Sequence, residues 1–310
     1  METMGKFQRS WLLFTSSISV IAANKQLLVF PIAIAALMIV IVLFFLAPVA
    51  LIPTGHSVTQ VEHWQAVGNT LFIETEGRGD GRPGITLSTG GMAYLAGLYL
   101  VSMFFATFFN VVFYNEILAA LEGDSVSIGR GLKFASTKLK SILMWSLLAG
   151  LVGLAIKTIE QRMGLIGRLI TRFIGATWSI ASVFAVPIIV REEQVTNPLT
   201  TLRRSADILK RTWGEALIGY VGLSFASSVI LIGSLGLLLV ALFVSIALNA
   251  FWIVAVVAVF WLLCVLLFGY LSSVAGQVYR GALYLYAADG RVAQPYSSEM
   301  LDSAWKFKKN

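Results

Sequence analysis

Residues Ala216 to Tyr279 read ALIGYVGLSFASSVILIGSLGLLLVALFVSIALNAFWIVAVVAVFWLLCVLLFGYLSSVAGQVY, a run of 64 residues without Lys, Arg, Asp, Glu or His. At about 1.5 Å per residue a single helix of this length would measure roughly 96 Å, about three times the hydrocarbon thickness of a bilayer. The run must therefore turn back, and Asn249, near its midpoint, is its most polar turning point. We predict two membrane spans, 216–247 and 250–279, although breaks at Gly233 and Gly236 would give three.

The composition of the whole chain agrees with a membrane protein. Of its 310 residues, 57% are hydrophobic and 13% are charged, and the mean hydropathy is +0.82. An ordinary soluble domain carries about 25% charged residues, so a soluble globule is excluded. The single cysteine, Cys264, has no partner for a disulfide. We therefore treat residues 1–310 as one polytopic membrane domain.

Four further uncharged runs precede the long one. Residues 27–53 and 92–115 are each long enough to cross the bilayer, and the second ends where Asn115 and Glu116 are expected to return the chain to water. Residues 141–156 and 173–190 are shorter. We expect them to cross as well, giving about six transmembrane helices in three hairpins and an all-α fold, with a re-entrant pair over 141–190 as the alternative.

The positions of the basic residues predict the orientation. The segments before residue 27, between 116 and 140, between 191 and 215 and after 279 hold 17 of the 23 Lys and Arg residues. Since basic residues favour the cytoplasmic side, we expect both termini there, in the plasma (cytoplasmic) membrane; a third span in the long run would place the basic tail outside. Lys157, Arg162, Arg168 and Arg172 contradict this pattern unless they lie on an interfacial helix.

Three basic segments have the pattern of amphipathic helices. Near the amino terminus Trp11, Phe14, Ile18 and Ile21 recur at helical spacing, which we interpret as an uncleaved helix in preference to a signal peptide. Residues 126–141 and 196–211 resemble each other and both precede an apolar span, so they are candidates for an internal repeat. Six basic residues of these two segments are the expected contacts to anionic lipid: Lys133, Lys140, Arg203, Arg204, Lys210 and Arg211.

A second repeat marks two helix ends. Residues Leu118 to Gly123 are echoed by Leu285 to Gly290, where an acidic residue and a glycine stop an apolar helix. Glycine is a good left-handed helix terminator, so both helices are expected to end at their glycine. Similar stop signals also arise without common ancestry, so the alternative interpretation is that the two helix ends are unrelated.

The external loop, residues 54–91, is expected to be small and to contain a β-hairpin. TLFIETE from Thr70 and ITLSTG from Ile85 alternate apolar and polar residues around a glycine-rich turn. The GxGxxG and Arg-Gly-Asp matches in that turn lack a following helix or other support, and we interpret them as turn sequence. His56 and His63 are expected to be exposed loop histidines and not metal ligands.

Chemistry-bearing motifs are absent from the sequence. There is no HExxH, GxSxG or GxxxxGK[ST] motif, and Cys264 has no neighbouring base, so we expect it to be a small core residue. Glu192 and Glu193 are expected to form ion pairs with the adjacent Arg191 on a solvent-exposed surface. We predict no enzymatic activity, no catalytic residue, no cofactor and no metal site.

The polar residues at membrane depth are neutral, which disfavours ion coupling. Small residues four apart, such as Ser146 and Gly150, are expected to let helices pack closely. The candidate buried polar cluster is Asn110, Asn115 and Gln277, at matching ends of the second and sixth spans.

Three stretches carry a family resemblance: FQRSWLLFTSSISVIAANKQLLVFP at the start, FFNVVFYNEILAALEGD with GLKFA after it, and VYRGALYLYAADGRV near the end. They resemble an uncharacterised prokaryotic integral membrane family, domain-of-unknown-function family 6159. The resemblance covers most of the chain except the external loop and implies no catalytic residues. The alternation of basic helices and hairpins is more distantly similar to the membrane domain of some glycerophosphodiester phosphodiesterases, whose soluble catalytic domain has no counterpart here.

Two functions follow from these patterns as expectations. The first is a non-enzymatic membrane protein that organises lipid or assembles with a membrane partner, because cationic in-plane helices provide a broad lipid-facing surface. The alternative is an uncoupled permease or channel for a lipidic or small neutral solute. The expected partners are membrane lipids, mainly anionic, and a possible protein partner or second copy of the chain, but no nucleic acid.

Overall fold

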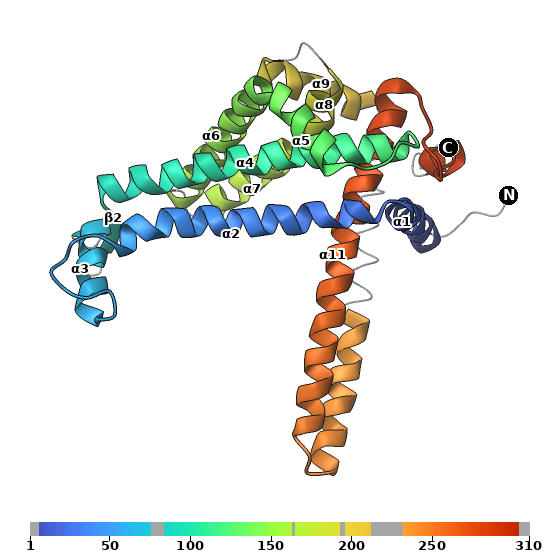
Figure 1. The fold of residues 1–310 in the computed structure, drawn as a ribbon. Coiled ribbons are helices and arrows are strands. Elements are labelled where there is room, and N and C mark those ends of the chain that lie inside the picture. The colour runs from blue at the N-terminus through green and yellow to red at the C-terminus, as the bar shows by residue number, and fades with distance from the viewer. Residues whose placement is uncertain (1–5, 76–83, 163–164, 193–195, 212–231, 304–310) are drawn as a thin grey trace. The chain divides into compact units, whose positions relative to one another are not determined.

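In the computed structural model the described residues are 6–75, 84–162, 165–192, 196–211 and 232–303, and they are helical almost throughout (Figure 1). The elements in chain order are α1 (Lys6–Ala23), η1 (Lys25–Leu28), α2 (Val29–Ala50), α3 (Val61–Leu71), β1 (Phe72–Thr75), β2 (Gly84–Leu87), α4 (Thr89–Leu121), α5 (Ile128–Thr137), α6 (Leu139–Arg162), α7 (Leu165–Ala181), α8 (Ala185–Arg191), α9 (Pro198–Arg211), a helix over Ile232–Ala247, α11 (Trp252–Asp289) and α12 (Ser298–Ser303).

Five helical segments of the described chain are long and apolar enough to cross a membrane: Lys25–Ala50, Thr89–Leu121, Leu139–Glu160, Gly167–Arg191 and Trp252–Asp289. They correspond to five of the six predicted spans. For the remaining one, 216–247, only the helix Ile232–Ala247 lies within the described residues. At most a third of each 18-residue apolar window is buried inside the protein, so these helices present apolar side chains outward.

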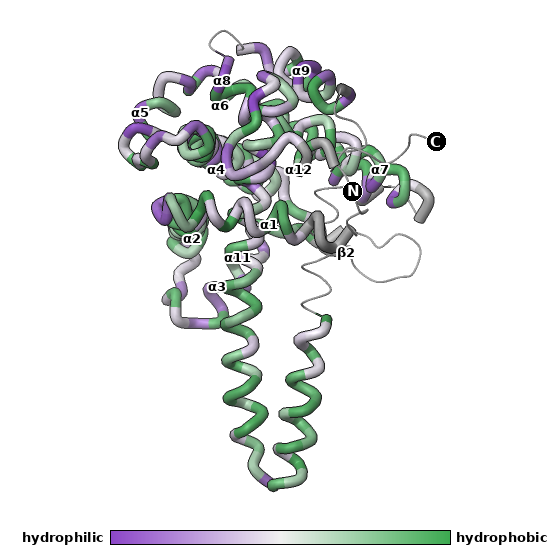
Figure 2. The backbone as a smooth tube through the Cα atoms, turned by 90° about the vertical axis from the view of Figure 1, so that its right-hand side faces the viewer, coloured by the Kyte–Doolittle hydropathy of each residue, from purple (hydrophilic) through white to green (hydrophobic). Residues whose placement is uncertain are grey.

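The predicted turn at Asn249 is confirmed. The helix Ile232–Ala247 and the first half of α11 run side by side and are joined there, and both are mainly hydrophobic (Figures 1 and 2). Asn249 has φ +49°, a left-handed conformation that Asn tolerates better than most residues. The Ser245 hydroxyl donates to the carbonyl of Ala250 at 2.9 Å, and the Trp261 indole donates to the Ser234 hydroxyl at 2.9 Å. These bonds satisfy polar groups that hydrocarbon would leave unpaired.

Cys264 on α11 is exposed, so the prediction of a small core residue is wrong. On a helix that turns most of its apolar surface outward, hydrophobicity does not indicate the buried face. Phe243, 72% exposed, and Phe260, 67% exposed, illustrate the same point.

The predicted span 173–190 is interrupted. Helix α7 ends at Ala181, and α8 begins at Ala185 after a turn. Pro187 explains the break. Its ring clashes with the carbonyl four residues before it, and proline has no N–H to donate to that carbonyl. The N–H of Phe184, left outside both helices, donates to the buried Ser205 hydroxyl of α9 at 3.1 Å.

The chain divides into two compact units. The first comprises Met1–Pro31, Asn110–Lys138 and Ala176–Asn310, and the second comprises Ile32–Phe109 and Leu139–Gly175. The core of the first unit joins the end of α4, α8 and the second half of α11, and includes Phe113, Ile117, Ile188, Val278 and Leu285. Gly281 allows α4 and α11 to approach, since a Cβ there would lie 2.8 Å from Cγ2 of Ile117.

In the second unit, β1 and β2 form the predicted antiparallel hairpin, with Phe72 opposite Leu87. The glycine-rich turn and its two motif matches lie mostly outside the described residues. Helix α3, which the sequence reading did not foresee, precedes the hairpin. Small-residue packing is confirmed at Gly150 of α6, whose Cβ position would lie 3.0 Å from Leu100 of α4.

His63 corrects the expectation of two exposed loop histidines. His56 is exposed, but His63 of α3 is only 2% exposed. Its Nδ1 lies 2.6 Å from the Thr54 hydroxyl, and its Nε2 lies 2.9 Å from the carbonyl oxygen of Ala50 at the end of α2. The imidazole therefore links α3 to α2 by contacting a carbonyl in the last turn of α2, which has no hydrogen-bond donor within its own helix.

Both predicted glycine stops are confirmed. Gly123 after α4 has φ +90°, and Gly290 after α11 has φ +67°. At the first, the N–H of Asp124 donates to the carbonyl of Ala119 at 2.9 Å, as in a Schellman motif. The two ends share this local geometry, which carries no information on common ancestry.

The predicted amino-terminal helix is present as α1. Of its predicted apolar stripe, Ile21 is buried and Trp11 is 44% exposed, and the buried face also includes Leu13, Ser17 and Val20. The Ser17 hydroxyl lies 2.7 Å from the hydroxyl of Tyr296, and α1 packs against α11 and α12. The bond between Ser17 and Tyr296 thus favours burial of the face of α1 that carries Ser17.

Candidate functional site

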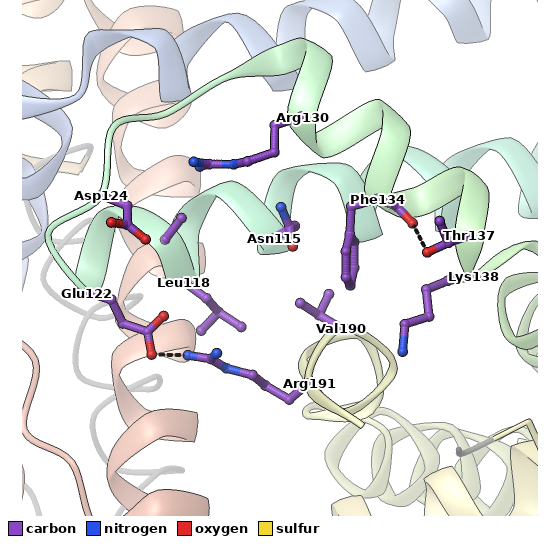
Figure 3. Close-up of a pocket in the computed structure, with 11 residues that line it drawn as sticks. Asn115, Leu118, Glu122, Asp124, Arg130, Phe134, Thr137, Lys138, Val190 and Arg191 are labelled. Atoms are coloured by element: carbon purple, nitrogen blue, oxygen red, sulfur yellow. Dashed lines mark hydrogen bonds and ion pairs between the residues drawn. The ribbon is translucent and has the colours of Figure 1, made fainter. Parts of the chain in front are cut away.

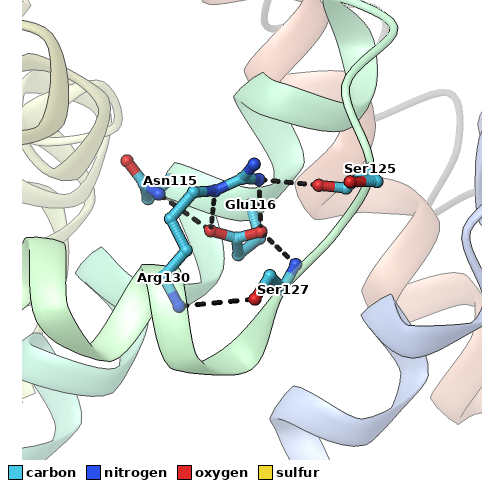
Figure 4. A network of polar contacts seen from close by, with 5 residues as sticks. All are labelled: Asn115, Glu116, Ser125, Ser127 and Arg130. Carbon is cyan, nitrogen blue, oxygen red and sulfur yellow. Dashed lines mark hydrogen bonds and ion pairs between the residues drawn. The ribbon is translucent and has the colours of Figure 1, made fainter.

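A fully buried carboxylate, that of Glu116, organises the end of α4 (Figure 4). Its oxygens accept hydrogen bonds from Arg130 Nε at 3.2 Å and Nη2 at 2.7 Å, from the Ser127 N–H at 2.6 Å and from Asn115 Nδ2 at 2.9 Å. The expectation that Asn115 and Glu116 return the chain to water is wrong, because α4 continues to Leu121. The loop and helix that follow fold back over the carboxylate.

Local sequence places Arg130 over this carboxylate. Ser127 caps α5 by accepting a hydrogen bond from the Arg130 N–H at 3.4 Å, which fixes the start of the helix. Gly131 lets α5 approach α4, since a Cβ there would lie 2.9 Å from Val112 Cγ1. The hydrogen bond to Glu116 raises the pKa of Arg130 above its usual value, so the guanidinium remains charged. Arg130 also donates to the carbonyl of Ser125 at 2.8 Å.

A second carboxylate, Glu122, joins the ends of three helices. Glu122 follows α4, and it forms ion pairs with Arg191 at the end of α8 and, at 3.4 Å, with Arg291 just after α11. Arg191 was expected to pair with the adjacent Glu192 and Glu193. Within the described residues Arg191 pairs with Glu122 and not with Glu192, because the end of α8 lies against the end of α4; Glu193 is outside those residues.

Glu192 joins the two predicted lipid-facing helices. Its carboxylate pairs with Nε of Arg204 on α9 at 2.6 Å, and its backbone carbonyl accepts from Nζ of Lys138, just after α5, at 2.8 Å. Burial raises the pKa of Glu192, and the charges of Arg204 and Lys138 oppose that rise. Glu193 lies outside the described residues.

A pocket of about 600 Å³ lies between these contacts (Figure 3). Its charged lining consists of Glu122, Asp124, Arg130, Lys138 and Arg191. Its remaining lining residues are Asn115, Leu118, Ala119, Phe134, Thr137 and Val190. The two carboxylates lie at one end of the pocket and Lys138 lies at the other, with apolar side chains between them (Figure 3). This arrangement is suited to binding a polar group that carries charge, and in the described chain no three His, Cys, Asp or Glu side chains gather as metal ligands would.

The predicted polar cluster stays a prediction. Asn110, Asn115 and Gln277 are each half-buried. The amide of Asn115 is used by Glu116, and Asn115 lines the pocket. Through this bond Asn115 takes part in the contacts of the buried Glu116 carboxylate.

The predicted lipid contacts lie on the surface wherever their side chains are described. Lys133, Lys140, Arg203 and Lys210 are exposed, and so is Arg204, which pairs with Glu192. The side chain of Arg211 lies outside the described residues.

Sequence reasoning missed Glu116, Glu122, Arg130 and Arg191 as site residues. One signal was available for Glu116: it is an acid in an apolar helix, followed 14 residues later by an arginine. A buried acid requires a cation, and the capping residue Ser127 places a helix start close to Arg130. The pairing of Glu122 with residues 69 and 169 positions away had no local signal.

Comparison with known proteins identifies the family. The model of a Family of unknown function (DUF6159) matches residues 89–294. The chain belongs to this family. The DUF6159 match includes every residue of the pocket and of the Glu116, Glu122 and Glu192 contacts, and it confirms the resemblance stated from the sequence. No curated protein and no solved structure matches this chain.

Proposed function

We propose that this protein is a non-enzymatic, multi-pass protein of the cytoplasmic membrane that organises anionic lipid along α5 and α9. In this proposal both termini are cytoplasmic and the two helices lie in the plane of the inner leaflet. The observation that carries the proposal is the mixture of exposed apolar and basic side chains on both helices.

On α5, Ile128 and Leu132 are exposed and four residues apart, and the exposed Lys133 follows them. On α9, the exposed Leu199 and Arg203 are likewise four residues apart. Apolar and basic side chains on one accessible face are typical of helices that lie at the boundary between lipid headgroups and acyl chains.

The two helices are also firmly attached. Arg130 of α5 is bound to the buried Glu116, and Glu192 links Lys138 to Arg204 of α9. Exposed cations on a fixed scaffold keep a constant spacing. A constant spacing favours an ordered arrangement of the bound lipids, whereas mobile cations would attract anionic lipids without ordering them. This rigidity supports an organising function.

The orientation is supported by contacts at the chain ends. Ser17 of α1 bonds to Tyr296, and Ser16 lies near the sulfur of Met300 on α12. These contacts support placing α1 and α12 on the same side of the membrane, and the excess of basic residues in the corresponding segments favours the cytoplasmic side.

The test compares lipid retention by native mass spectrometry in detergent. The purified protein is equilibrated with equal amounts of phosphatidylglycerol and phosphatidylcholine of the same chain length. The unaltered protein is expected to retain mainly phosphatidylglycerol. The threefold variant K133Q/R203Q/K210Q should lose this preference, because each basic group near an anionic surface contributes about 1 kcal/mol.

The matched control is K133R/R203K/K210R, which keeps the charges and should keep the preference. Equal retention of both lipids by the unaltered protein would refute the proposal. A co-purifying protein that is lost from the glutamine variant would instead assign the surface to a membrane partner.

The polar residues near and within the spans give less support to the alternative function, a permease or channel, than to the organisation of lipid. The Thr107 hydroxyl of α4 donates to the Met103 carbonyl at 2.8 Å, and the Ser182 hydroxyl, in the turn after α7, donates to the Ser179 carbonyl at 3.4 Å. Hydroxyls whose proton is already donated to a backbone carbonyl have less hydrogen-bonding capacity left for a solute. Glycerol flux into proteoliposomes that falls in an Asn110→Ala variant would support the alternative.

A further inference from the structure

We propose that another pocket, formed by β2, α4 and α6, binds one long-chain fatty acid, with the acyl chain inside the pocket and the carboxylate at Lys157. This α4–α6 pocket lies within the second compact unit. It shares no lining residue with the pocket beside Glu122 and includes none of the exposed basic residues of α5 and α9. The inference therefore goes beyond the proposed function and does not depend on it.

The α4–α6 pocket arises where the start of α4 packs against the end of α6. Its volume is about 380 Å³. Seven residues of helix rise by about 10 Å, roughly a third of the hydrocarbon thickness, which suits part of one acyl chain. The residues that α4 contributes occupy positions i, i+3, i+4 and i+7, and so lie on one face of the helix: Met92, Leu95, Ala96 and Tyr99.

Gly153 of α6 places a hydroxyl group at this pocket. A Cβ at Gly153 would lie 2.5 Å from the Tyr99 hydroxyl oxygen, so the absence of a side chain there lets the hydroxyl rest against α6. Lys157 follows Gly153 by four residues and lines the pocket from the same face of α6. Tyr99 and Lys157 are the polar side chains of the lining, and the residues beside them are apolar or glycine.

Neither polar side chain has a partner in the part of the chain that the structure describes. Lys157 is exposed and takes part in none of the ion pairs there; the only acid of α6, Glu160, does not pair with it. The Tyr99 hydroxyl likewise forms no hydrogen bond to a described residue. One cation and one hydroxyl beside an apolar pocket complement an amphiphile with a single negative head. A carboxylate offers two oxygens, one for each donor.

The size of the pocket favours a fatty acid over a phospholipid. A volume of about 380 Å³ lies near the lower end of the range for ligand pockets, about 300 to 1,000 Å³. A phospholipid would bring a second chain and further phosphate and ester oxygens, for which the lining has no additional side-chain donor. A bound carboxylate also gives a partner to Lys157, one of the basic residues that contradict the predicted orientation.

The test compares two ligands that differ in the head. Palmitate and hexadecanol have alkyl chains of the same length, but only palmitate is charged in weakly alkaline buffer. The full-length protein in detergent is mixed with equal amounts of both, and the adducts are counted by native mass spectrometry. We expect the one-ligand adduct to contain palmitate at least about fivefold more often than hexadecanol, since an accessible ion pair contributes up to about that factor and the Tyr99 hydrogen bond adds to it.

The variants separate the charge from the apolar pocket. Lys157→Met should reduce the palmitate adduct about fivefold and leave the hexadecanol adduct unchanged, whereas Lys157→Arg should retain both. Ala96→Phe, which fills the pocket with an apolar ring, should remove both adducts. The matched control Arg168→Met removes an exposed cation of the same unit outside the pocket and should change neither. Thermal melting of each variant in detergent identifies any that does not fold.

Equal binding of palmitate and hexadecanol by the unaltered protein would overturn the proposal. So would a folded Lys157→Met variant that keeps its preference for palmitate, or an Arg168→Met variant that loses it as completely, because the attraction would then be a general effect of surface charge. Displacement of palmitate by an equal amount of phosphatidylglycerol would also overturn it, by assigning the pocket to a phospholipid.

Discussion

Replacing Arg130 by methionine is expected to destabilise the protein by about 2 to 4 kcal/mol. Glu116 is completely buried, and Arg130 supplies two of its four hydrogen bonds, at 2.7 and 3.2 Å. Breaking a buried ion pair by removing one partner typically costs about 3 to 5 kcal/mol, because the other charge is left uncompensated. The side chain of Arg130 is 42% exposed, so water can partly replace it, and we therefore set the expected cost about 1 kcal/mol below that range.

The assay is unfolding in mixed micelles with increasing SDS, followed by circular dichroism. A double-mutant cycle isolates the interaction, because Glu116→Gln removes the charge while keeping the shape of the side chain. The double variant E116Q/R130M should recover at least about 1 kcal/mol relative to the sum of the single variants. Lys133→Met, which removes an exposed cation from the same helix, should change stability by less than about 0.5 kcal/mol. Additive single variants, or an Arg130→Met variant as stable as the unaltered protein, would refute the reasoning.

Three further predictions use the same unfolding assay. Gly281→Ala should cost about 1 to 3 kcal/mol, because its Cβ would lie 2.8 Å from Cγ2 of Ile117, whereas Gly269→Ala, with open space around it, should have little effect. Because the pKa of Glu192 is raised in the folded protein, the folded state binds this proton more tightly, and Glu192 should contribute stability as the pH falls from 7 toward 4.5. Glu192→Gln should remove that contribution, and an unchanged pH profile would contradict the assignment. Ser205→Ala should cost about 1 to 3 kcal/mol by leaving a buried backbone N–H at the start of α8 unpaired; no change in unfolding would show that water replaces the hydroxyl.

Local patterns in the sequence were reliable guides to local structure. The charge-free run from Ala216 to Tyr279 requires a turn, and Asn249 provides it because its short polar side chain tolerates positive φ. Gly123 and Gly290 end their helices for the same conformational reason. In each case the information lies within a few residues of the feature that it determines.

The same reasoning failed where the outcome depended on a distant partner. Glu116 is polar enough to suggest the end of a span, yet Arg130 and the loop before it make burial favourable. His63 looks like a loop residue but is buried against the end of α2. Cys264 looks like a core residue but lies on an outward face, since apolar residues surround the whole helix.

The sequence by itself determined that the chain forms apolar helices of membrane-spanning length separated by basic amphipathic segments, because hydrophobicity and helix-ending residues act over one or two turns. Only the tertiary structure decided which charges meet. Glu122 lies 69 residues from Arg191 and 169 residues from Arg291, and the packing of α4 against α8 and α11 brings the three together. The pocket beside them exists for the same reason: ion pairing acts through space, and a linear sequence does not specify distances between helix ends.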